Sequence, residues 1–190
     1  MTPPVLEAAA REAVERCLAA PPTLGAGRLL CVDGPSGSGK TTFARALRRA
    51  VPAGTSVRVV HLDALYPGWD GLAEGVTRVA RDLLAPLAAG HPGGYRRYDW
   101  HAGHDAEWVE VEPVDLLVLE GVGAGGDVSS APWVTLLVWV EAARDVRTGR
   151  ALERDGLATE TELRAWWQQE GAWFAEHRTP ERADLVVRTG

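Results

Sequence analysis

Hydrophobic and polar positions change their spacing along the chain in a regular order, from short apolar runs to longer stretches with helical periodicity. Apolar runs typical of strands occupy 29–33, 57–62, 114–120, 134–140 and 184–189. Apolar residues recur at helical spacing over 5–20, 42–49, 75–89, 142–155 and 159–177. The segment 90–103, rich in glycine and aromatic residues, predicts no regular element, while 108–112 alternates like a short exposed strand. This alternation predicts an α/β fold with a parallel sheet of about five strands.

Composition narrows the class of protein without pointing to a function. With 190 residues, one domain spanning 1–190 is expected, with an N-terminal helix within 1–22. The net charge of −6 argues against a nucleic-acid-binding protein, which would usually be basic. No apolar run approaches the length of a membrane span, and a signal-peptide pattern is absent. We therefore expect a cytoplasmic protein with no membrane or nucleic-acid partner; the sequence leaves a homo-oligomer open.

The stretch 34–41 lies between the first predicted strand and the helix after it, and reads GPSGSGKT. It matches G-x-x-x-x-G-K-[ST], the P-loop pattern in which successive backbone N–H groups surround nucleotide phosphates. Lys40 is expected to reach the β- and γ-phosphates, and the Thr41 hydroxyl is expected to ligate Mg²⁺. Lys40 is also the only lysine in an arginine-rich sequence, and a compact ammonium suits a tight phosphate loop. A glycine-rich turn that matches by accident is the alternative, which the flanking strand and helix disfavour.

Carboxylates follow two of the other predicted strands. Asp63 and Tyr66 come directly after the strand at 57–62, and Glu120 ends the strand at 114–120. In an open α/β sheet, ligands bind beyond the carboxyl ends of the strands. Glu120 is therefore expected to act as a Walker-B-like carboxylate near Mg²⁺. For Asp63 and Tyr66, a capping residue and a packed ring are the alternative interpretation.

The helix predicted at 142–155 carries a row of arginines within an arc of roughly 120° on one face. These are Arg144, Arg147, Arg150 and Arg154. Beside a P-loop, such a row indicates a lid, over 142–158, that closes on the phosphates and balances their charge. A solvated face with Asp145 and Glu153 as partners is the alternative.

Together these motifs resemble the uridine kinase and phosphoribulokinase family over about residues 27–188. The segments that carry the resemblance are 34–42 (the P-loop), 61–66 (the family's D-D-F-Y), 98–100 (Y-D-F), 119–121 (F-E-G), 147–155 (R-x-x-R…R-D) and 181–187 (ADxVV). The resemblance implies a P-loop NTPase three-layer sandwich with a short helical lid. It also implies a kinase that uses ATP and Mg²⁺ to phosphorylate a hydroxyl group of a small molecule.

The resemblance further assigns roles to individual residues. Asp63 would be the general base. Charge on the transferred phosphate would be balanced by Lys40, Arg147 and Arg150. Mg²⁺ would be held by Thr41, Glu120 and Asp63. The nucleotide would be bound by Gly34, Ser36, Gly37, Ser38, Gly39, Lys40, Thr41, Thr42, Arg144 and Arg154. The acceptor pocket would be lined by Tyr66, Tyr98, Trp100, His101 and His104.

Two departures from the family pattern leave the acceptor open. Ala64 and Leu65 replace the second Asp and the Phe of D-D-F-Y, and the stretch 67–97 lacks a clear match to nucleoside-holding elements. A nucleoside is favoured, with pantothenate or a sugar as alternatives. A nucleoside monophosphate would need arginines on its phosphate, for which the candidates are Arg78, Arg81, Arg96 and Arg97. A nucleotide-binding switch or ATPase without an acceptor is the remaining alternative, although the aromatic cluster at 95–108 favours a pocket.

Overall fold

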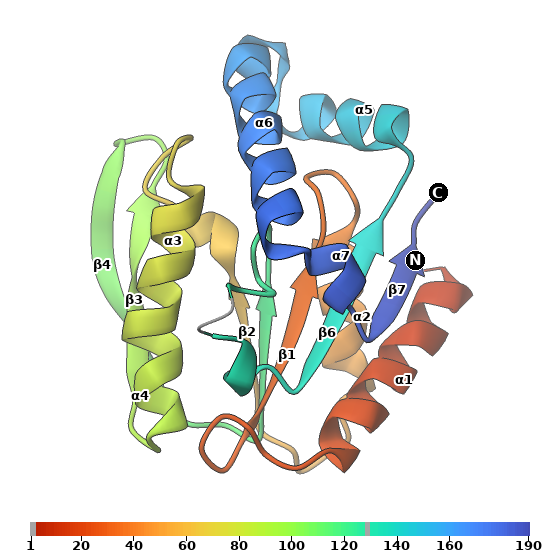
Figure 1. Ribbon diagram of the computed structural model, residues 1–190, viewed down its shortest axis with the longest axis vertical. Helices are drawn as coiled ribbons and strands as arrows, with labels where there is room; N and C mark the ends of the chain where they lie inside the picture. Colours follow the sequence, from red (N-terminus) through yellow and green to blue (C-terminus); the bar gives the residue numbers. More distant parts are fainter. Residues whose placement is uncertain (1–2, 128–129) are drawn as a thin grey trace.

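A five-stranded parallel sheet forms the centre of the molecule (Figure 1); the computed structural model describes residues 3–127 and 130–190. The strand order is β2-β5-β1-β6-β7, so that β1 lies in the middle. These strands are β1 (Arg28–Asp33), β2 (Val57–His61), β5 (Leu116–Glu120), β6 (Leu136–Glu141) and β7 (Leu185–Arg188). The parallel sheet of about five strands predicted from the sequence is confirmed.

Alternate residues of the central strands face opposite helical layers, which explains why these strands are apolar throughout. Leu30 of β1 belongs to the core cluster that contains residues of α1 (Pro4–Ala19) and α2 (Lys40–Ala50). Its neighbour Leu29 belongs to the opposite cluster, which contains residues of α3 (Leu72–Arg78). Both leucines are fully buried. The sheet between two helical layers is the three-layer α/β sandwich that the sequence predicted.

The helix predicted over 75–89 begins earlier and changes pitch along its length. α3 continues through a π-helical stretch (Val79–Leu84) into α4 (Ala85–Ala88). Pro86 has no N–H to donate to the preceding turn, and the wider π-helical turns lie directly before it.

An antiparallel hairpin beside the main sheet was not predicted. β3 (Gly93–Asp99) pairs with β4 (His104–Val111), whereas the sequence pattern indicated a strand only at 108–112. Gly94 accounts for the error, because a Cβ there would lie 2.5 Å from the Trp108 ring. This glycine makes room for a side chain of the partner strand and does not mark a loop.

Two helices stand over the carboxyl end of the sheet in Figure 1, α5 (Arg144–Asp155) and α6 (Glu160–His177). α5 follows β6 and is the segment predicted to be a lid, and α7 (Thr179–Arg182) leads from α6 toward β7. The short 3₁₀ helices are Leu62–Ala64, Ala131–Trp133 and Leu157–Thr159. Among the described residues, no helix has the length and apolar character needed to cross a membrane.

Candidate active site

The loop between β1 and α2 has a backbone conformation that requires glycine at three positions. Gly34, Gly37 and Gly39 have φ angles of 143°, 75° and 95°. A Cβ on Gly34 would lie 2.1 Å from the carbonyl oxygen of Val140, and one on Gly37 would lie 2.2 Å from that of Arg147. The loop therefore packs backbone against backbone on β6 and α5, which fixes its shape.

The same loop presents polar groups that have no protein partner. Four backbone N–H groups of the loop donate no hydrogen bond within the described residues; they belong to Gly37, Gly39, Lys40 and Thr41. The hydroxyl oxygen of Ser38 is buried and also has no partner. Converging N–H groups at the start of a helix are the donors that an anion needs. The loop thus fits the phosphates of a nucleotide.

Lys40 is held against this loop by backbone carbonyls. Its Nζ donates to the carbonyl oxygen of Gly34 at 2.7 Å and to that of Pro35 at 3.0 Å, and the residue is 8% exposed. The ammonium is therefore placed at the mouth of the loop, where it can contact a bound phosphate.

Thr41 and Glu120 form the part of the site that fits Mg²⁺. Thr41 Oγ1 donates to Glu120 Oε1 at 3.1 Å, and His61 Nδ1 lies 2.5 Å from the same oxygen. The hydrogen bond to Glu120 raises the pKa of His61 above its ordinary value. Within residues 3–127 and 130–190, no group of three or more His, Cys, Asp or Glu side chains could hold a metal ion. Mg²⁺ usually takes one or two carboxylates together with waters and substrate phosphates, and this pair fits such a site.

Asp63 lies in the 3₁₀ helix that follows β2 and faces the same cleft. The residue as a whole is exposed, and its carboxylate makes no hydrogen bond within the described residues. The closely surrounding protein desolvates the carboxylate and so raises its pKa; Lys40 opposes this shift and Glu120 adds to it. A carboxylate with free lone pairs and a raised pKa suits proton abstraction at neutral pH.

A cavity of about 540 Å³ opens beside Asp63, and we call it the acceptor cavity. Its aromatic lining residues are Tyr66, Trp69, Trp100 and Trp166. Its polar and charged lining residues are Ser36, Asp63, His101, Arg154, Asp155 and Thr159. The cavity therefore joins the P-loop, the end of β2, the hairpin and the lid region in one space.

Three of the four aromatic side chains in this cavity have their polar ends engaged by the protein. The hydrogen bonds are Tyr66 Oη to Val122 O (2.6 Å), Trp100 Nε1 to Asp63 O (2.8 Å) and Trp166 Nε1 to Ser36 Oγ (3.1 Å). Trp69 contacts Trp100 edge-on, with ring centroids 5.2 Å apart. With their polar ends engaged, the rings offer mainly flat apolar surface to a ligand.

The residues predicted to line the acceptor pocket fall into three groups. Tyr66, Trp100 and His101 line the cavity. Tyr98 is not among the lining residues but packs against one of them, with its ring centroid 5.2 Å from that of Trp100. His104 is not brought to the cavity, since it begins β4 as an exposed residue.

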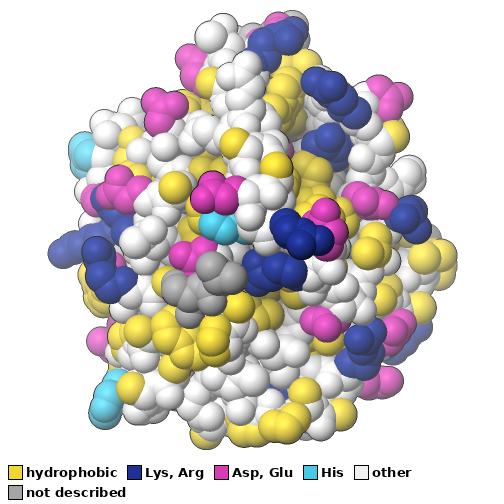
Figure 2. All heavy atoms as spheres, viewed as in Figure 1, with side chains coloured by type: hydrophobic (Ala, Val, Ile, Leu, Met, Phe, Trp, Pro, Cys, Tyr) yellow, Lys and Arg dark blue, Asp and Glu magenta, His cyan; other side chains and the backbone are white. Residues whose placement is uncertain are grey.

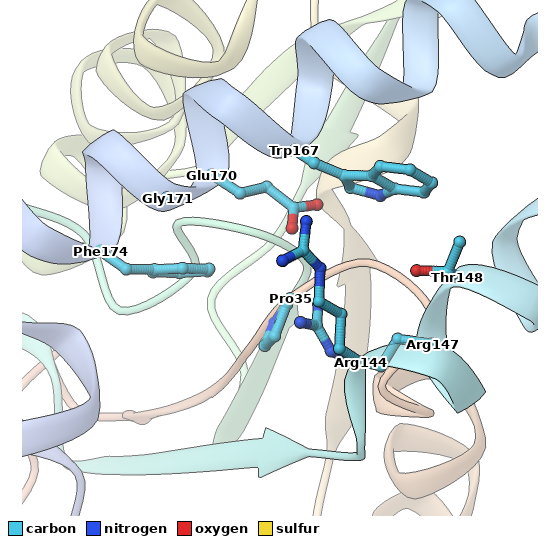
Figure 3. Close-up of a pocket in the computed structure, with 8 residues that line it drawn as sticks. All are labelled: Pro35, Arg144, Arg147, Thr148, Trp167, Glu170, Gly171 and Phe174. Carbon is cyan, nitrogen blue, oxygen red and sulfur yellow. The ribbon is translucent and has the colours of Figure 1, made fainter.

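The predicted row of arginines does not converge on one point. Arg144 and Arg147 line a second cavity of about 250 Å³ together with Pro35 and Glu170 (Figure 3). In the space-filling view, basic side chains gather over α5 (Figure 2). The second cavity shares no lining residue with the acceptor cavity, and Pro35 is the P-loop residue in its lining.

The other two arginines of the row reach different parts of the site. Arg150 Nη1 donates to the carbonyl oxygen of Gly37 at 3.4 Å and to Thr189 Oγ1 at 3.0 Å. Arg154 lines the acceptor cavity and pairs with its neighbour Asp155 at 2.7 Å. The lid helix thus contacts the P-loop with Arg150 and the acceptor cavity with Arg154.

Asp33 is a structural residue of the site that the sequence analysis missed. Its carboxylate accepts hydrogen bonds from the N–H groups of Gly34 (2.7 Å), Gly123 (2.9 Å) and Gly125 (2.9 Å). Burial raises its pKa to about 6, against the opposing effect of these hydrogen bonds. Asp33 ties the P-loop to the loop after Glu120. The sequence did offer a signal for this role, which is an acidic residue at the end of an apolar strand.

α6 makes two contacts with the P-loop that were also missed. Glu170 accepts the Ser36 N–H with both carboxylate oxygens, at 3.0 and 3.2 Å, and Trp166 donates to the Ser36 hydroxyl. The sequence analysis gave neither Trp166 nor Glu170 a role in the site. These partners lie 134 and 130 residues apart, so no local pattern could reveal them.

The fold and the P-loop define a nucleotide-binding protein of the P-loop class, and comparisons narrow that class. No protein-family model matches the sequence. A uridine kinase from Halobacterium salinarum is 30% identical over 146 residues, which cover 70% of this chain and 64% of that protein. A uridine kinase from Latilactobacillus sakei is 30% identical over 182 residues, which cover 85% of each chain. The chain therefore spans just under two thirds of the first relative and most of the second.

Solved structures agree with this placement at the level of fold. A possible uridine kinase from Bacillus stearothermophilus has a TM-score of 0.68 and 23% identity, covering 96% of this chain and 98% of that one. A candidate fructose transport system kinase from Silicibacter sp. TM1040 has a TM-score of 0.68 and 20% identity over 95% of this chain. The chain belongs to the uridine kinase family of P-loop kinases, as its motifs indicated.

Proposed function

We propose that this protein is an ATP-dependent kinase that transfers the γ-phosphate of ATP to a hydroxyl group of a nucleoside. The observation that carries the proposal is the placement of Asp63 between a phosphate-binding loop and an aromatic cavity of about 540 Å³. A phosphate loop alone supports nucleotide binding, whereas a base that faces a separate cavity supports transfer to a second substrate.

The phosphate side of the mechanism relies on the P-loop and the lid. The unbonded N–H groups of the loop and Lys40 would hold the phosphates and balance the charge that develops on the transferred group. Mg²⁺, held by Thr41 and Glu120, would supply positive charge at the phosphates. Arg147 and Arg150 add positive charge from α5, which already packs on the loop.

The acceptor side of the mechanism depends on Asp63. Its carboxylate would take the proton of the acceptor hydroxyl while the hydroxyl oxygen forms its bond to the γ-phosphorus. The bond from that phosphorus to the β–γ bridging oxygen breaks, and ADP leaves with the bonding electrons. Closure of α5 over the cleft would exclude water, which would otherwise compete with the acceptor.

The charge of the acceptor cavity favours a nucleoside over a nucleoside monophosphate. The arginines considered for an acceptor phosphate are not among the residues that line this cavity. Arg78 is bonded to Glu74 and Asp105. Arg81 pairs with Asp82.

Arg96 and Arg97 belong to the hairpin, and Arg97 pairs with Glu107. The arginine that does line the cavity, Arg154, is paired with Asp155. The phosphate of a nucleoside monophosphate in this cavity would therefore be repelled by Asp63 and Asp155, with little free positive charge to offset the repulsion.

The remaining alternatives fit the cavity less well. Pantothenate carries a carboxylate and would meet the same two acidic residues. A sugar could use the ring faces and the polar groups, but a planar base uses the flat aromatic walls more completely. A switch without an acceptor has no use for a cavity beside Asp63.

A substrate screen tests the proposal. Purified protein with Mg·ATP would be assayed for ADP release with uridine, cytidine, UMP, pantothenate and fructose, and the products identified by ³¹P NMR. We expect acceptor-dependent turnover with uridine or cytidine and a 5′-monophosphate product. Turnover that requires UMP, pantothenate or fructose would replace the nucleoside assignment, and ATP hydrolysis unaffected by every acceptor would support the switch.

A further inference from the structure

One turn of α6 holds the P-loop residue Ser36 by two different groups. The Glu170 carboxylate accepts the Ser36 N–H with both oxygens at 3.0 and 3.2 Å, and Trp166 Nε1 donates to the Ser36 hydroxyl at 3.1 Å. Residues four apart in a helix lie on the same face, so both groups meet one loop residue from one side. Ser36 is therefore fixed at its main chain and at its side chain by a single helix.

The carboxylate of Glu170 is an unusual choice for packing a helix on a loop. Glu170 is 3% exposed. A carboxylate buried in this way loses its hydrating water, and a small number of protein hydrogen bonds must compensate for that loss. Figure 3 shows it directed from α6 into the cavity that also receives Arg144 and Arg147. An apolar side chain would pack the helix on the loop without the free-energy cost of burying a charge. Residues that break such a packing rule concentrate at functional sites.

Trp166 connects the same loop residue to the acceptor cavity. Its indole ring lines that cavity and contacts Tyr66 with ring centroids 4.8 Å apart. A ligand that stacks in the cavity would restrict this ring, and the ring N–H would in turn restrict Ser36. Ser36 directly precedes Gly37, where the unbonded N–H groups of the phosphate nest begin.

We propose that Trp166 and Glu170 form a latch on Ser36 through which a ligand in the acceptor cavity sets the shape of the phosphate loop, with Glu170 as a positioning residue. The latch makes the two binding sites energetically coupled: each ligand is bound more tightly when the other is present. This inference rests on the proposed function only in taking the cavity as the acceptor site. The contacts with Ser36 are independent of the acceptor's identity.

The first test measures the latch without any ligand. Amide hydrogen exchange at Ser36 would be followed by NMR in the wild type, Glu170→Ala, Glu170→Gln and the control Glu162→Gln, which changes an exposed glutamate of α6. We expect exchange at Ser36 to become about 10-fold faster or more in Glu170→Ala, because the N–H loses its acceptor. Glu170→Gln keeps a carbonyl acceptor and should stay within about threefold of wild type. Unchanged exchange in Glu170→Ala, or an equal change in Glu162→Gln, would overturn the latch.

The second test measures coupling, with uridine as the acceptor probe. The Kd of Mg·AMP-PNP would be measured by calorimetry with and without saturating uridine. In the wild type, uridine should tighten nucleotide binding about fivefold or more. In Glu170→Ala and Trp166→Phe this gain should fall below about twofold, with each variant compared with its own Kd in the absence of uridine. Trp166→Phe keeps a smaller aromatic wall and removes the donated N–H, so it serves if Glu170→Ala folds poorly.

The outcomes separate the latch from the proposed function. A wild type that binds uridine and nucleotide without mutual effect would overturn the coupling. A wild type that does not bind uridine would refute the proposed acceptor, and the exchange of Ser36 would still decide whether Glu170 holds the loop. Lower melting temperatures with full coupling in both variants would reduce the contacts to helix packing and overturn the proposal.

Discussion

The two halves of the active-site cleft are built in opposite ways. The phosphate loop consists of consecutive residues whose shape follows from glycines and from the start of α2. The acceptor cavity draws residues from the P-loop, the end of β2, the hairpin turn, the end of α5 and α6. The first half depends mainly on local backbone geometry, and the second depends on the packing of distant segments.

The two halves also differ in the groups that they leave free. The loop leaves backbone N–H groups unbonded, which suits an anion of any identity. The cavity engages the polar ends of three aromatic side chains and leaves their ring faces. Without an acceptor, phosphate binding should therefore tolerate changes to the cavity walls that do not contact Ser36, whereas acceptor binding should be sensitive to single changes in packing.

The largest effect is expected where the two halves meet. Asp63→Asn should lower kcat by about 10²–10⁴-fold, the usual cost of a lost general base, with little change in the Kd of ATP. In the wild type, activity should fall as pH drops through the raised pKa of Asp63, since the base must be ionised. The asparagine variant should lack this acid limb. Asp70→Asn, an exposed neighbour, is the control, and retained activity in Asp63→Asn would make Asp63 structural.

Removing the loop's ammonium should affect the phosphate half alone. Lys40→Ala should lower kcat/KM for ATP by about 10²–10³-fold, the usual loss for one charge-stabilising donor. Binding of the acceptor without nucleotide, measured by calorimetry, should remain close to that of the wild type. Arg48→Ala removes an exposed positive charge from the same helix and should have little effect. Unchanged turnover of Lys40→Ala would be incompatible with the P-loop assignment.

Removing an aromatic wall should affect the acceptor half alone. Trp100→Ala should raise the KM of the nucleoside by about 10-fold, given that stacking on an aromatic ring is worth about 1–3 kcal/mol. The Kd of ATP should change by less than about twofold, because Trp100 packs on Trp69 and Tyr98 and donates its N–H to the Asp63 carbonyl oxygen. Trp108→Ala, which removes an exposed ring of the hairpin, is the matched control. Equal losses in both variants would indicate damage to the hairpin and not to a stacking site.

The smallest effect on chemistry should come from the tie between the two loops. Asp33→Asn places an amide N–H₂ where a carboxylate oxygen now accepts from a backbone N–H, and one buried donor loses its partner. The free energy of unfolding should drop by about 1–3 kcal/mol, as is usual for an unsatisfied buried group. Denaturant unfolding measures this, with the exposed Asp145→Asn as the control. A variant as stable as the wild type would mean that the loops do not depend on Asp33.

The difference between the halves also explains what the sequence could predict. The strands of the sheet and the P-loop were predictable because apolar runs and glycine spacing are local signals. The hairpin was missed because Gly94 is required by Trp108, a residue of the partner strand. Helical periodicity placed the four arginines of α5 on one face, but it could not reveal that this face spans two cavities and the loop between them. Glu170 carried no local signal, since its role depends on Ser36 of the P-loop, 134 residues earlier in the chain.

Lys40 gives this protein a practical property. Because the sequence contains no other lysine, isotope labelling of lysine would place a single reporter in the entire protein, inside the phosphate loop. The ammonium donates to two carbonyl oxygens of the loop, and its NMR frequency would change when a phosphate replaces them. Occupancy of the loop could then be titrated directly, without a dye, a coupled enzyme or knowledge of the acceptor.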